Sequence, residues 1–262
     1  MTSYDLFLFA GQSNMAGRGI FCEQFPETAP SLIPGAGVEF RAFSDPTKLY
    51  PVAEPFGVAE NNPDGIFEPG MKTGSLVTSF INTYFTITHM PVLGISASKG
   101  GSVIFRWQDE DDNADYLTDA LMRLCTAQAY CKSHNITLRR QFLLWCQGES
   151  DGDHHTSAAV YQKQFCQMYE KFKNAGIEHC FLIGIGAYNG TAADICYDEI
   201  RNAQYALAAA RDDITVVCRL FETMKKRGLM KDSFHYYQAG YNEVGENAGK
   251  NCAEYVLRTY CR

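Results

Sequence analysis

Five short and almost uninterrupted apolar runs recur along the chain, at residues 4–10, 91–97, 140–146, 179–188 and 214–220. Short runs without polar alternation predict β-strands that are buried on both faces. Segments with helical periodicity lie between and after them, at about 74–89, 115–134, 157–175, 194–211 and 239–260. Because strands and helices alternate, we expect an α/β fold, a three-layer α/β/α sandwich built on a five-stranded parallel sheet.

One region breaks this rhythm. Residues 20–70 hold most of the nine prolines of the chain and no convincing helix. A loop of this length in a compact domain usually either carries function or is a peripheral insertion. This one comes soon after the first predicted strand. No internal repeat, low-complexity tract or linker is found elsewhere. The sequence therefore predicts a single domain over 1–262, with a long Pro/Gly-rich loop insertion at about 20–70.

Composition and charge narrow the classes of partner. The chain has 46% hydrophobic residues and a formal net charge of −7, which disfavours nucleic acid and anionic membrane surfaces as partners. No apolar run approaches the ~20 residues that cross a bilayer, and the N-terminus lacks a basic region and a cleavage signature. We expect a cytoplasmic protein that acts on a neutral or weakly charged small molecule. The pattern predicts no particular oligomeric state.

Several features of the sequence that could suggest a metal site or disulfides have simpler interpretations. The ten cysteines form no C-x-x-C pair and lie mostly in apolar runs, which favours reduced core thiols over a disulfide framework or a zinc site. His154 and His155 are neighbours and cannot share a helix face, so a solvated loop is favoured. The acidic run from Asp109 to Asp112 lacks the spaced ligands and central glycine of a calcium loop. We expect neither a metal nor a cofactor.

Polar motifs follow the predicted strands, at the edge where ligands bind in an open parallel sheet. The string Gly-Gln-Ser-Asn-Met-Ala-Gly-Arg follows the first run, and its turn could lift the Ser13 hydroxyl toward a substrate. A serine in this place is more often a helix cap. Gly100 and Gly101 follow the second run, where a backbone N–H can approach a ligand closely, although an ordinary turn uses the same residues.

Two further motifs supply polar side chains. Gln147 follows the third run within Trp-Cys-Gln-Gly-Glu-Ser-Asp, where its amide could bond a developing oxyanion, although a glutamine here is more often a loop residue. Asp232 and His235 precede the last helix. A serine nucleophile needs a base, and the imidazole needs a carboxylate that fixes its tautomer. The D-x-x-H tetrapeptide offers both groups. Considered alone, however, Asp232 is more typical of a surface cap, and His235 is more typical of a solvated histidine.

Taken together and in this order, the motifs resemble those of the SGNH hydrolases. The branch of sialate O-acetylesterases and acetylxylan esterases, carbohydrate esterase family 6, is the most similar. Its successive blocks resemble the GQSNMAGR string, the GGS string with Trp107 a few residues on, the W-x-Q-G-E-S-D string and the D-x-x-H. The resemblance covers residues 4 to 250. It implies a flavodoxin-like SGNH-hydrolase fold and a serine esterase that hydrolyses O-acetyl esters of acetylxylan, of other acetylated oligosaccharides or of sialic acid.

The resemblance also implies roles for individual residues. Ser13 would be the nucleophile, His235 the general base and then acid, and Asp232 the residue that orients the imidazole. Glu149 matches a position that could supply the acidic partner instead, so both carboxyls stay candidates.

The implied oxyanion hole has three donors. They are the Ser13 N–H, the N–H of Gly100 or Gly101, and the side-chain amide of Gln147, which stands where other branches have asparagine. Both side chains offer the same NH₂ donor and differ only in reach. Spacing does not choose between the two glycines.

Four other residues are candidates for substrate contact or support. Gln12 and Asn14 match the family string, but their side chains could instead bond the backbone of the turn. Trp107 and Arg106 could flank a sugar ring, since rings stack on aromatic faces and guanidinium groups bond hydroxyls. Alternatively, Trp107 covers the core beside the sheet edge.

Two other functions use the same features. A carbohydrate-binding protein on this fold would keep the cleft without turnover, and a short-chain lipase or thioesterase would prefer longer acyl groups. The loop at 20–70 has no long apolar run that suggests an acyl groove, which favours short acyl groups. Nucleotide binding is disfavoured because no phosphate-binding glycine motif follows any strand.

Overall fold

A single sheet runs through the computed structural model, which describes residues 2–108 and 116–260. Its strand order is β3-β2-β4-β1-β5-β6-β7. The strands are β1 (Ser3–Gly11), β2 (Gly37–Phe40), β3 (Leu49–Pro51), β4 (Val92–Ser98), β5 (Thr137–Cys146), β6 (His179–Ile183) and β7 (Ile214–Cys218). Neighbouring strands pair in parallel, except that β2 and β3 are antiparallel. The acidic run from Asp109 to Asp112 lies outside the described residues.

The prediction of a five-stranded parallel sheet is corrected to a mixed sheet of seven strands. The five apolar runs form β1, β4, β5, β6 and β7, in the order that flavodoxin-like folds adopt. The two additional strands, β2 and β3, come from the region at 20–70 that was predicted to be a loop. They have only four and three residues, too few for a readable alternation, and β3 ends in a proline at the sheet edge.

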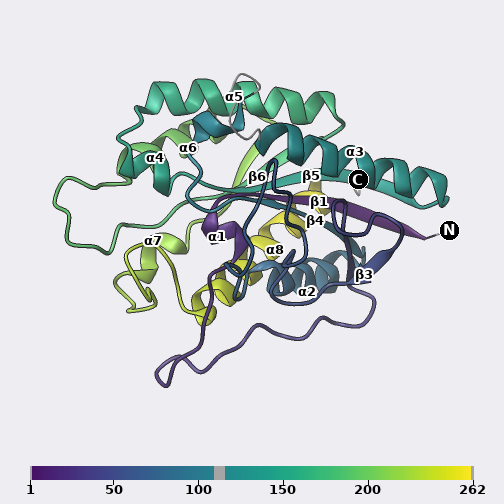
Figure 1. Ribbon diagram of the computed structural model, residues 1–262, viewed down its shortest axis with the longest axis horizontal. Coiled ribbons are helices and arrows are strands. Elements are labelled where there is room, and N and C mark those ends of the chain that lie inside the picture. Colours follow the sequence, from purple (N-terminus) through teal and green to yellow (C-terminus); the bar gives the residue numbers. More distant parts are fainter. Residues whose placement is uncertain (1, 109–115, 261–262) are drawn as a thin grey trace.

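Helices cover both faces of the sheet, as predicted. Figure 1 shows α3 (Tyr116–Ser133), α5 (Ala158–Asn174) and α6 (Asp198–Ala210) on one face, with α2 (Val77–Thr88) and α8 (Gln238–Tyr260) on the other. Each corresponds to one of the five periodic segments to within a few residues. The structure also has the short elements α1 (Ser13–Ala16), η1 (Ile104–Trp107), α4 (Glu149–Asp153) and α7 (Phe221–Met224).

The central strand shows why its sequence is continuously apolar. Leu6 and Leu8 of β1 point into the core beneath α3, α5 and α6, whereas Phe7 and Phe9 point into the core beneath α2 and α8. All four side chains are buried, and burying each contributes about 1.5–3 kcal/mol relative to an exposed position. The sheet is thus fixed from both sides, which holds the ends of its strands in place.

The described residues include no membrane-spanning helix and no cluster of metal ligands. None of their helices is both long and apolar enough to cross a bilayer. Over 2–108 and 116–260, no group of three His, Cys, Asp or Glu side chains is placed to hold a metal ion. His154 and His155 are exposed, and His155 lies 3.7 Å from Asp194. The described cysteines are free thiols.

Candidate active site

The predicted motifs meet at one edge of the sheet. Strands β4, β1 and β5 are adjacent, and the last residue of β1, Gly11, pairs with Ser98 on one side and with Cys146 on the other. The segments that follow these three strands therefore emerge side by side. The segment at 232–235 reaches the same place from the end of the chain, just before α8.

A tight turn places Ser13 after β1. Gly11 has a φ of 137°, and a Cβ there would lie 2.1 Å from the Cys146 carbonyl oxygen, so only glycine fits. The Gln12 N–H donates to that same carbonyl over 2.9 Å. Ser13 then begins the four-residue helix α1, while Gln12 occupies the capping position without a side-chain cap. Ser13 is therefore not the helix cap that its position after a strand suggested.

Ser13, His235 and Asp232 form a continuous chain of hydrogen bonds. The His235 Nε2 atom lies 3.0 Å from Ser13 Oγ. On the other side of the ring, Nδ1 lies 3.0 Å from Asp232 Oδ2 and 3.1 Å from Oδ1. Asp232 Oδ1 also accepts the backbone N–H groups of Phe234, at 2.8 Å, and of His235, at 2.7 Å. The tetrapeptide thus folds back so that its carboxylate meets its own imidazole.

The protonation states fit a general base. Burial lowers the pKa of His235 below its usual value, although the Asp232 carboxylate partly opposes this effect. Partial burial raises the pKa of Asp232, but the hydrogen bonds from Phe234 and His235 outweigh it and hold the pKa below its usual value. Near neutral pH, Asp232 is thus ionised and His235 is neutral. A proton on Nδ1 faces the carboxylate, which leaves Nε2 to accept the Ser13 proton.

Glu149 has different partners. Its Oε1 accepts a hydrogen bond of 2.6 Å from the Asn14 side chain, whose Nδ2 also donates to the Phe234 carbonyl over 3.1 Å. The Asn14 Oδ1 accepts the Tyr241 hydroxyl at 2.6 Å. Glu149 Oε2 is buried and has no hydrogen-bond partner among the described residues. Burial raises the pKa of Glu149 to about 7. Asn14 therefore connects α1, Glu149, α8 and the segment that carries His235.

Gln12 also supports the turn. Its Oε1 accepts the backbone N–H of Gly148 at 3.0 Å and that of Ser150 at 3.3 Å. The side chain therefore joins the end of β1 to the start of α4. The sequence left open whether Gln12 and Asn14 contact substrate or support the turn. Both side chains form supporting hydrogen bonds, and Gln12 also lines the cavity described below.

The two candidate glycines differ in what they bind. The Gly100 N–H donates to Glu68 Oε1 over 2.5 Å. Gly101 has a φ of 68°, in the left-handed region that favours glycine. Within the described residues, neither the Gly101 N–H nor the Ser13 N–H has a hydrogen-bond acceptor. Of the two glycines, Gly101 is therefore the one with an N–H open to a ligand.

Gln147 forms its hydrogen bonds with residues other than Ser13. Its Nε2 donates to the Ser102 carbonyl over 2.9 Å and to an Asp151 carboxylate oxygen. The side chain is fully buried and does not line the cavity. The amide thus bonds the backbone next to Gly101. Its direct role in the oxyanion hole stays a prediction.

Trp107 and Arg106 are also outside the cavity. Trp107 is fully buried, with ring centroids 4.9 Å from Trp145 and 5.8 Å from Tyr116. Its Nε1 donates to Ser102 Oγ over 3.1 Å. The Arg106 guanidinium lies 5.5 Å from the Tyr116 ring centroid. Trp107 therefore covers the core, which was the second of the two alternatives.

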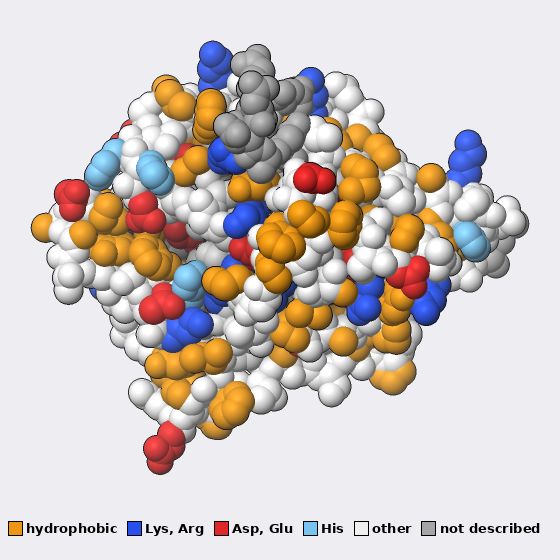
Figure 2. Space-filling model, in the orientation of Figure 1, with side chains coloured by type: hydrophobic (Ala, Val, Ile, Leu, Met, Phe, Trp, Pro, Cys, Tyr) orange, Lys and Arg blue, Asp and Glu red, His pale blue; other side chains and the backbone are white. Residues whose placement is uncertain are grey.

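A cavity of about 340 Å³ opens over Ser13 and His235. Figure 2 shows acidic, basic and hydrophobic side chains mixed around a hollow on this face. The lining residues are Gln12, Ser13, Arg18, Phe67, Glu68, Pro69, Met71, Lys99, Gly100, Gly101, Glu149, Ser150, Asp153, Phe234 and His235.

Comparison with known proteins places the chain in a family. Residues 3–254 match the family described as "Carbohydrate esterase, sialic acid-specific acetylesterase". The chain belongs to this family. It is therefore a carboxylic ester hydrolase that acts on O-acetyl esters of carbohydrates, as the sequence motifs predicted. No curated protein sequence matches the chain.

Solved structures share the fold of this carbohydrate esterase. A protein from Arabidopsis thaliana is 18% identical, with a TM-score of 0.67, and the match covers 98% of this chain and 99% of that one. A carbohydrate acetylesterase from Xanthomonas citri is 14% identical, with a TM-score of 0.60, covering 98% of this chain and 57% of that one. An alpha/beta hydrolase from the metagenome of Lake Arreo, Spain, is 12% identical, with a TM-score of 0.51, covering 97% and 98%.

Several cavity residues of this esterase were missed by the sequence analysis. Arg18 closes the first motif and Lys99 precedes the glycine pair, but neither was singled out. Phe67 and Glu68 come from the region at 20–70 and Met71 directly follows it, where no periodicity marks a side chain as buried or functional. Only the general rule that long loops carry function pointed to this region.

Proposed function

We propose that the chain removes acetyl groups from carbohydrates through a covalent acyl-enzyme on Ser13. The observation that carries this proposal is the 3.0 Å contact between Ser13 Oγ and His235 Nε2, with Asp232 on the opposite ring nitrogen. A serine hydroxyl is a weak nucleophile at neutral pH, and an adjacent neutral imidazole removes this limitation by accepting its proton.

In the acylation step, Ser13 Oγ attacks the acetyl carbonyl carbon while its proton passes to His235 Nε2. The carbonyl oxygen becomes the oxyanion of a tetrahedral intermediate. When this intermediate collapses, the bond to the sugar oxygen breaks and His235 returns the proton to that oxygen. Asp232 stabilises the imidazolium throughout the step. The sugar leaves as an alcohol, and the acetyl group stays on Ser13.

Deacylation repeats the same chemistry with water. The water attacks the acetyl carbonyl of the acyl-enzyme as its proton passes to His235 Nε2. Collapse of the second tetrahedral intermediate breaks the bond to Ser13 Oγ, which takes the proton back from His235. Acetate is released and the enzyme returns to its starting state.

The oxyanion is stabilised by the N–H groups of Ser13 and Gly101. Both have no acceptor among the described residues, and both residues line the cavity. Gln147 acts mainly through the backbone, because its amide bonds the Ser102 carbonyl next to Gly101. Preorganised donors of this kind stabilise charge that develops in the transition state without having to reorganise.

The cavity suits a small acyl group attached to a sugar. Its volume of about 340 Å³ is at the small end of ligand sites. Phe67 and Met71 are 44% and 54% exposed at its rim, and they offer apolar surface to a sugar ring or to a short acyl chain. Arg18 and Lys99 also line the cavity, and their charged groups can bond hydroxyls. We infer that acetylated monosaccharides or short oligosaccharides are the substrates.

The test is hydrolysis of p-nitrophenyl acetate, butyrate and octanoate by the wild type and by Ser13→Ala. Acetate should be the preferred ester, and the variant should be inactive although its circular dichroism and thermal unfolding match the wild type. Equal inactivity of both proteins would contradict the proposal and favour carbohydrate binding without turnover. Preference for octanoate would favour a lipase or thioesterase.

A further inference from the structure

Glu68 brings a carboxylate from the long region at 20–70 into the catalytic cavity. The residue is only 5% exposed. Its Oε1 accepts the Gly100 N–H at 2.5 Å, and its Oε2 lies 2.7 Å from the Arg18 guanidinium. The Lys99 ammonium lies 3.7 Å from Oε1. Both carboxylate oxygens therefore face donors, and one of these donors belongs to the loop that carries Gly101.

The backbone around Glu68 is itself fixed. The Glu68 N–H donates to Asn61 Oδ1 over 2.8 Å. Two residues earlier, the Ile66 N–H donates to Asp119 Oδ2 over 2.8 Å, and the Ile66 carbonyl accepts from Arg123 Nη2 at 3.4 Å. Asp119 and Arg123 belong to α3, a rigid helix packed on the sheet. Glu68 is therefore not at the tip of a loose loop.

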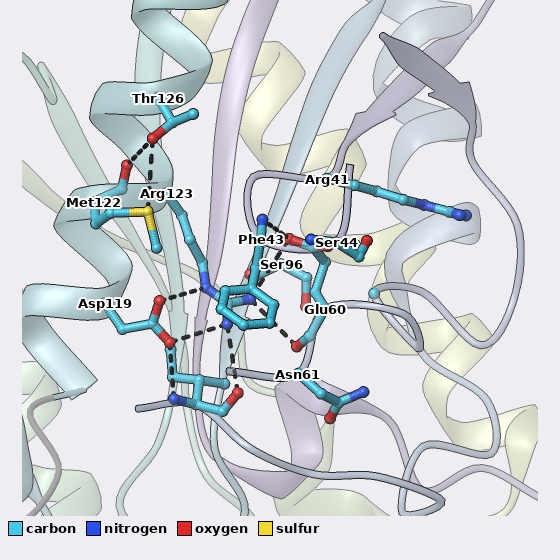
Figure 3. A network of polar contacts seen from close by, with 12 residues as sticks. Arg41, Phe43, Ser44, Glu60, Asn61, Ser96, Asp119, Met122, Arg123 and Thr126 are labelled. Atoms are coloured by element: carbon cyan, nitrogen blue, oxygen red, sulfur yellow. Dashed lines mark hydrogen bonds and ion pairs between the residues drawn. The ribbon is translucent and has the colours of Figure 1, made fainter. Parts of the chain in front are cut away.

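Arg123 connects this loop to the strand that precedes Gly100. Figure 3 shows its guanidinium between Asp119, Glu60 and Ser96. It bonds both Asp119 oxygens, at 3.0 and 2.9 Å, and donates to the Ser96 carbonyl of β4 over 2.8 Å. The side chain is fully buried, so these bonds form where water does not compete. One guanidinium thus sets the distance between β4 and the segment that carries Glu68.

The Gly100–Gly101 pair needs such support. Glycine has the largest conformational freedom of any residue, and two in succession leave the directions of their N–H groups poorly defined. An oxyanion donor is effective only when its heavy atom lies about 2.7–3.1 Å from the developing charge. The bond from Gly100 to Glu68 fixes one peptide of the pair, and the direction of the next peptide depends on it.

We propose that Glu68 is a positioning residue: its hydrogen bond to the Gly100 N–H orients the Gly101 N–H toward the oxyanion. This inference rests on the proposed function. The hydrogen bond carries the effect, whereas the charge of Glu68 serves mainly to pair with Arg18. A residue in this role affects the transition state more than the bound substrate, so its loss should lower kcat and leave KM nearly unchanged.

Two conservative substitutions separate the hydrogen bond from the charge. Glu68→Gln keeps a carbonyl oxygen at the same reach but removes the charge. Glu68→Asp keeps the charge, but the side chain is one methylene shorter and cannot hold the Gly100 N–H in place. The matched control is Glu39→Asp, because Glu39 is also a buried carboxylate of this region, paired with Arg41 at 3.0 Å, and does not line the cavity.

The experiment measures kcat and KM for p-nitrophenyl acetate, together with thermal unfolding. Glu68→Asp should lower kcat by about 10- to 100-fold with KM within about twofold, since a small misplacement of a catalytic group has effects of this size. Glu68→Gln should stay within about threefold of the wild type, and Glu39→Asp should match the wild-type kcat. If Glu68→Asp does not fold, Asn61→Ala loosens the same segment from a half-exposed position and should lower kcat by a few-fold.

Three results would overturn the positioning role while the wild type is active. They are an unchanged kcat in Glu68→Asp and Asn61→Ala, a change confined to KM, or a loss of kcat in Glu68→Gln that Glu68→Asp does not share, which would assign the effect to charge. A wild type as inactive as Ser13→Ala would instead overturn the proposed function itself.

Discussion

Two segments border the catalytic cavity, and each carries a carboxyl that could serve His235. In the segment at 232–235, the side chains of Asp232 and His235 bond each other, and His235 continues to Ser13. In the segment at 147–151, Gln147 bonds the Ser102 carbonyl and Glu149 bonds Asn14, although Glu149 also lines the cavity. In the proposed mechanism, the first segment holds the reacting groups and the second holds the scaffold around them.

The two carboxyls differ in charge because they differ both in burial and in the number of hydrogen bonds they accept. The Asp232 side chain is 43% exposed, and its hydrogen bonds hold its pKa below the usual value despite the raising effect of burial. Glu149 is 2% exposed with a single side-chain bond, and burial raises its pKa to about 7. The number of N–H groups aimed at a carboxyl, rather than its proximity to the cavity, thus decides which one acts as the anion.

The largest effect that tests this comparison is expected for Asp232→Asn. The new side chain keeps an oxygen for the two backbone N–H groups, but its NH₂ faces Nδ1 and favours the wrong imidazole tautomer. We expect kcat to fall by about 10²- to 10⁴-fold. The measurement is p-nitrophenyl acetate hydrolysis, with Glu149→Gln as the control. A larger loss in Glu149→Gln than in Asp232→Asn would exchange the roles of the two carboxyls.

Gln147→Ala should have an intermediate effect. A direct oxyanion donor would cost about 10²- to 10³-fold in kcat when removed. Because the amide instead bonds the Ser102 carbonyl and Asp151, we expect a smaller loss of kcat and a loss of about 1–3 kcal/mol in the free energy of unfolding. Denaturant unfolding and steady-state kinetics measure both. A full 10²-fold loss in a protein of unchanged stability would return the amide to the oxyanion hole.

Glu149→Gln should have the smallest effect on kcat but a clear effect on the pH dependence of stability. A carboxyl whose pKa is raised by folding stabilises the native state fully only below its unfolded pKa, and this contribution is lost as pH rises through about 7. Between about pH 5 and pH 8, the wild type should therefore lose on the order of 2–3 kcal/mol more unfolding free energy than the variant. Denaturant unfolding at both pH values measures this difference, and parallel curves for the two proteins would contradict a buried neutral Glu149.

The fold was predictable where burial alone explains the pattern of apolar residues. Strand β1 is apolar at successive positions because Phe7 and Leu8 enter opposite cores, and this continuity predicts a doubly covered strand. Strands β2 and β3 were missed because tertiary pairing, of β2 with β4 and of β3 with β2, rather than any pattern of their own, makes them strands. Their few residues lie among prolines, where local sequence favours a loop.

The site was predictable to the extent that its groups follow strand ends or lie within one turn. Ser13 follows β1, and Asp232 and His235 are three residues apart, so their chemistry is visible in the sequence. Glu68 was missed because its role depends on Gly100, which is 32 positions away and reaches it only through tertiary structure. For Gln147, the sequence gives the donor but not its direction, which the Ser102 carbonyl decides.

The central claim is that the acetyl group passes through Ser13, and the most direct measurement is mass spectrometry of the enzyme quenched during acetate-ester turnover. The account predicts one acetyl group on the tryptic peptide that contains Ser13, absent from Ser13→Ala and accumulating in an initial burst when deacylation is the slower step. Efficient hydrolysis by Ser13→Ala, or an acetyl group on another residue that turns over at the rate of the reaction, would contradict it.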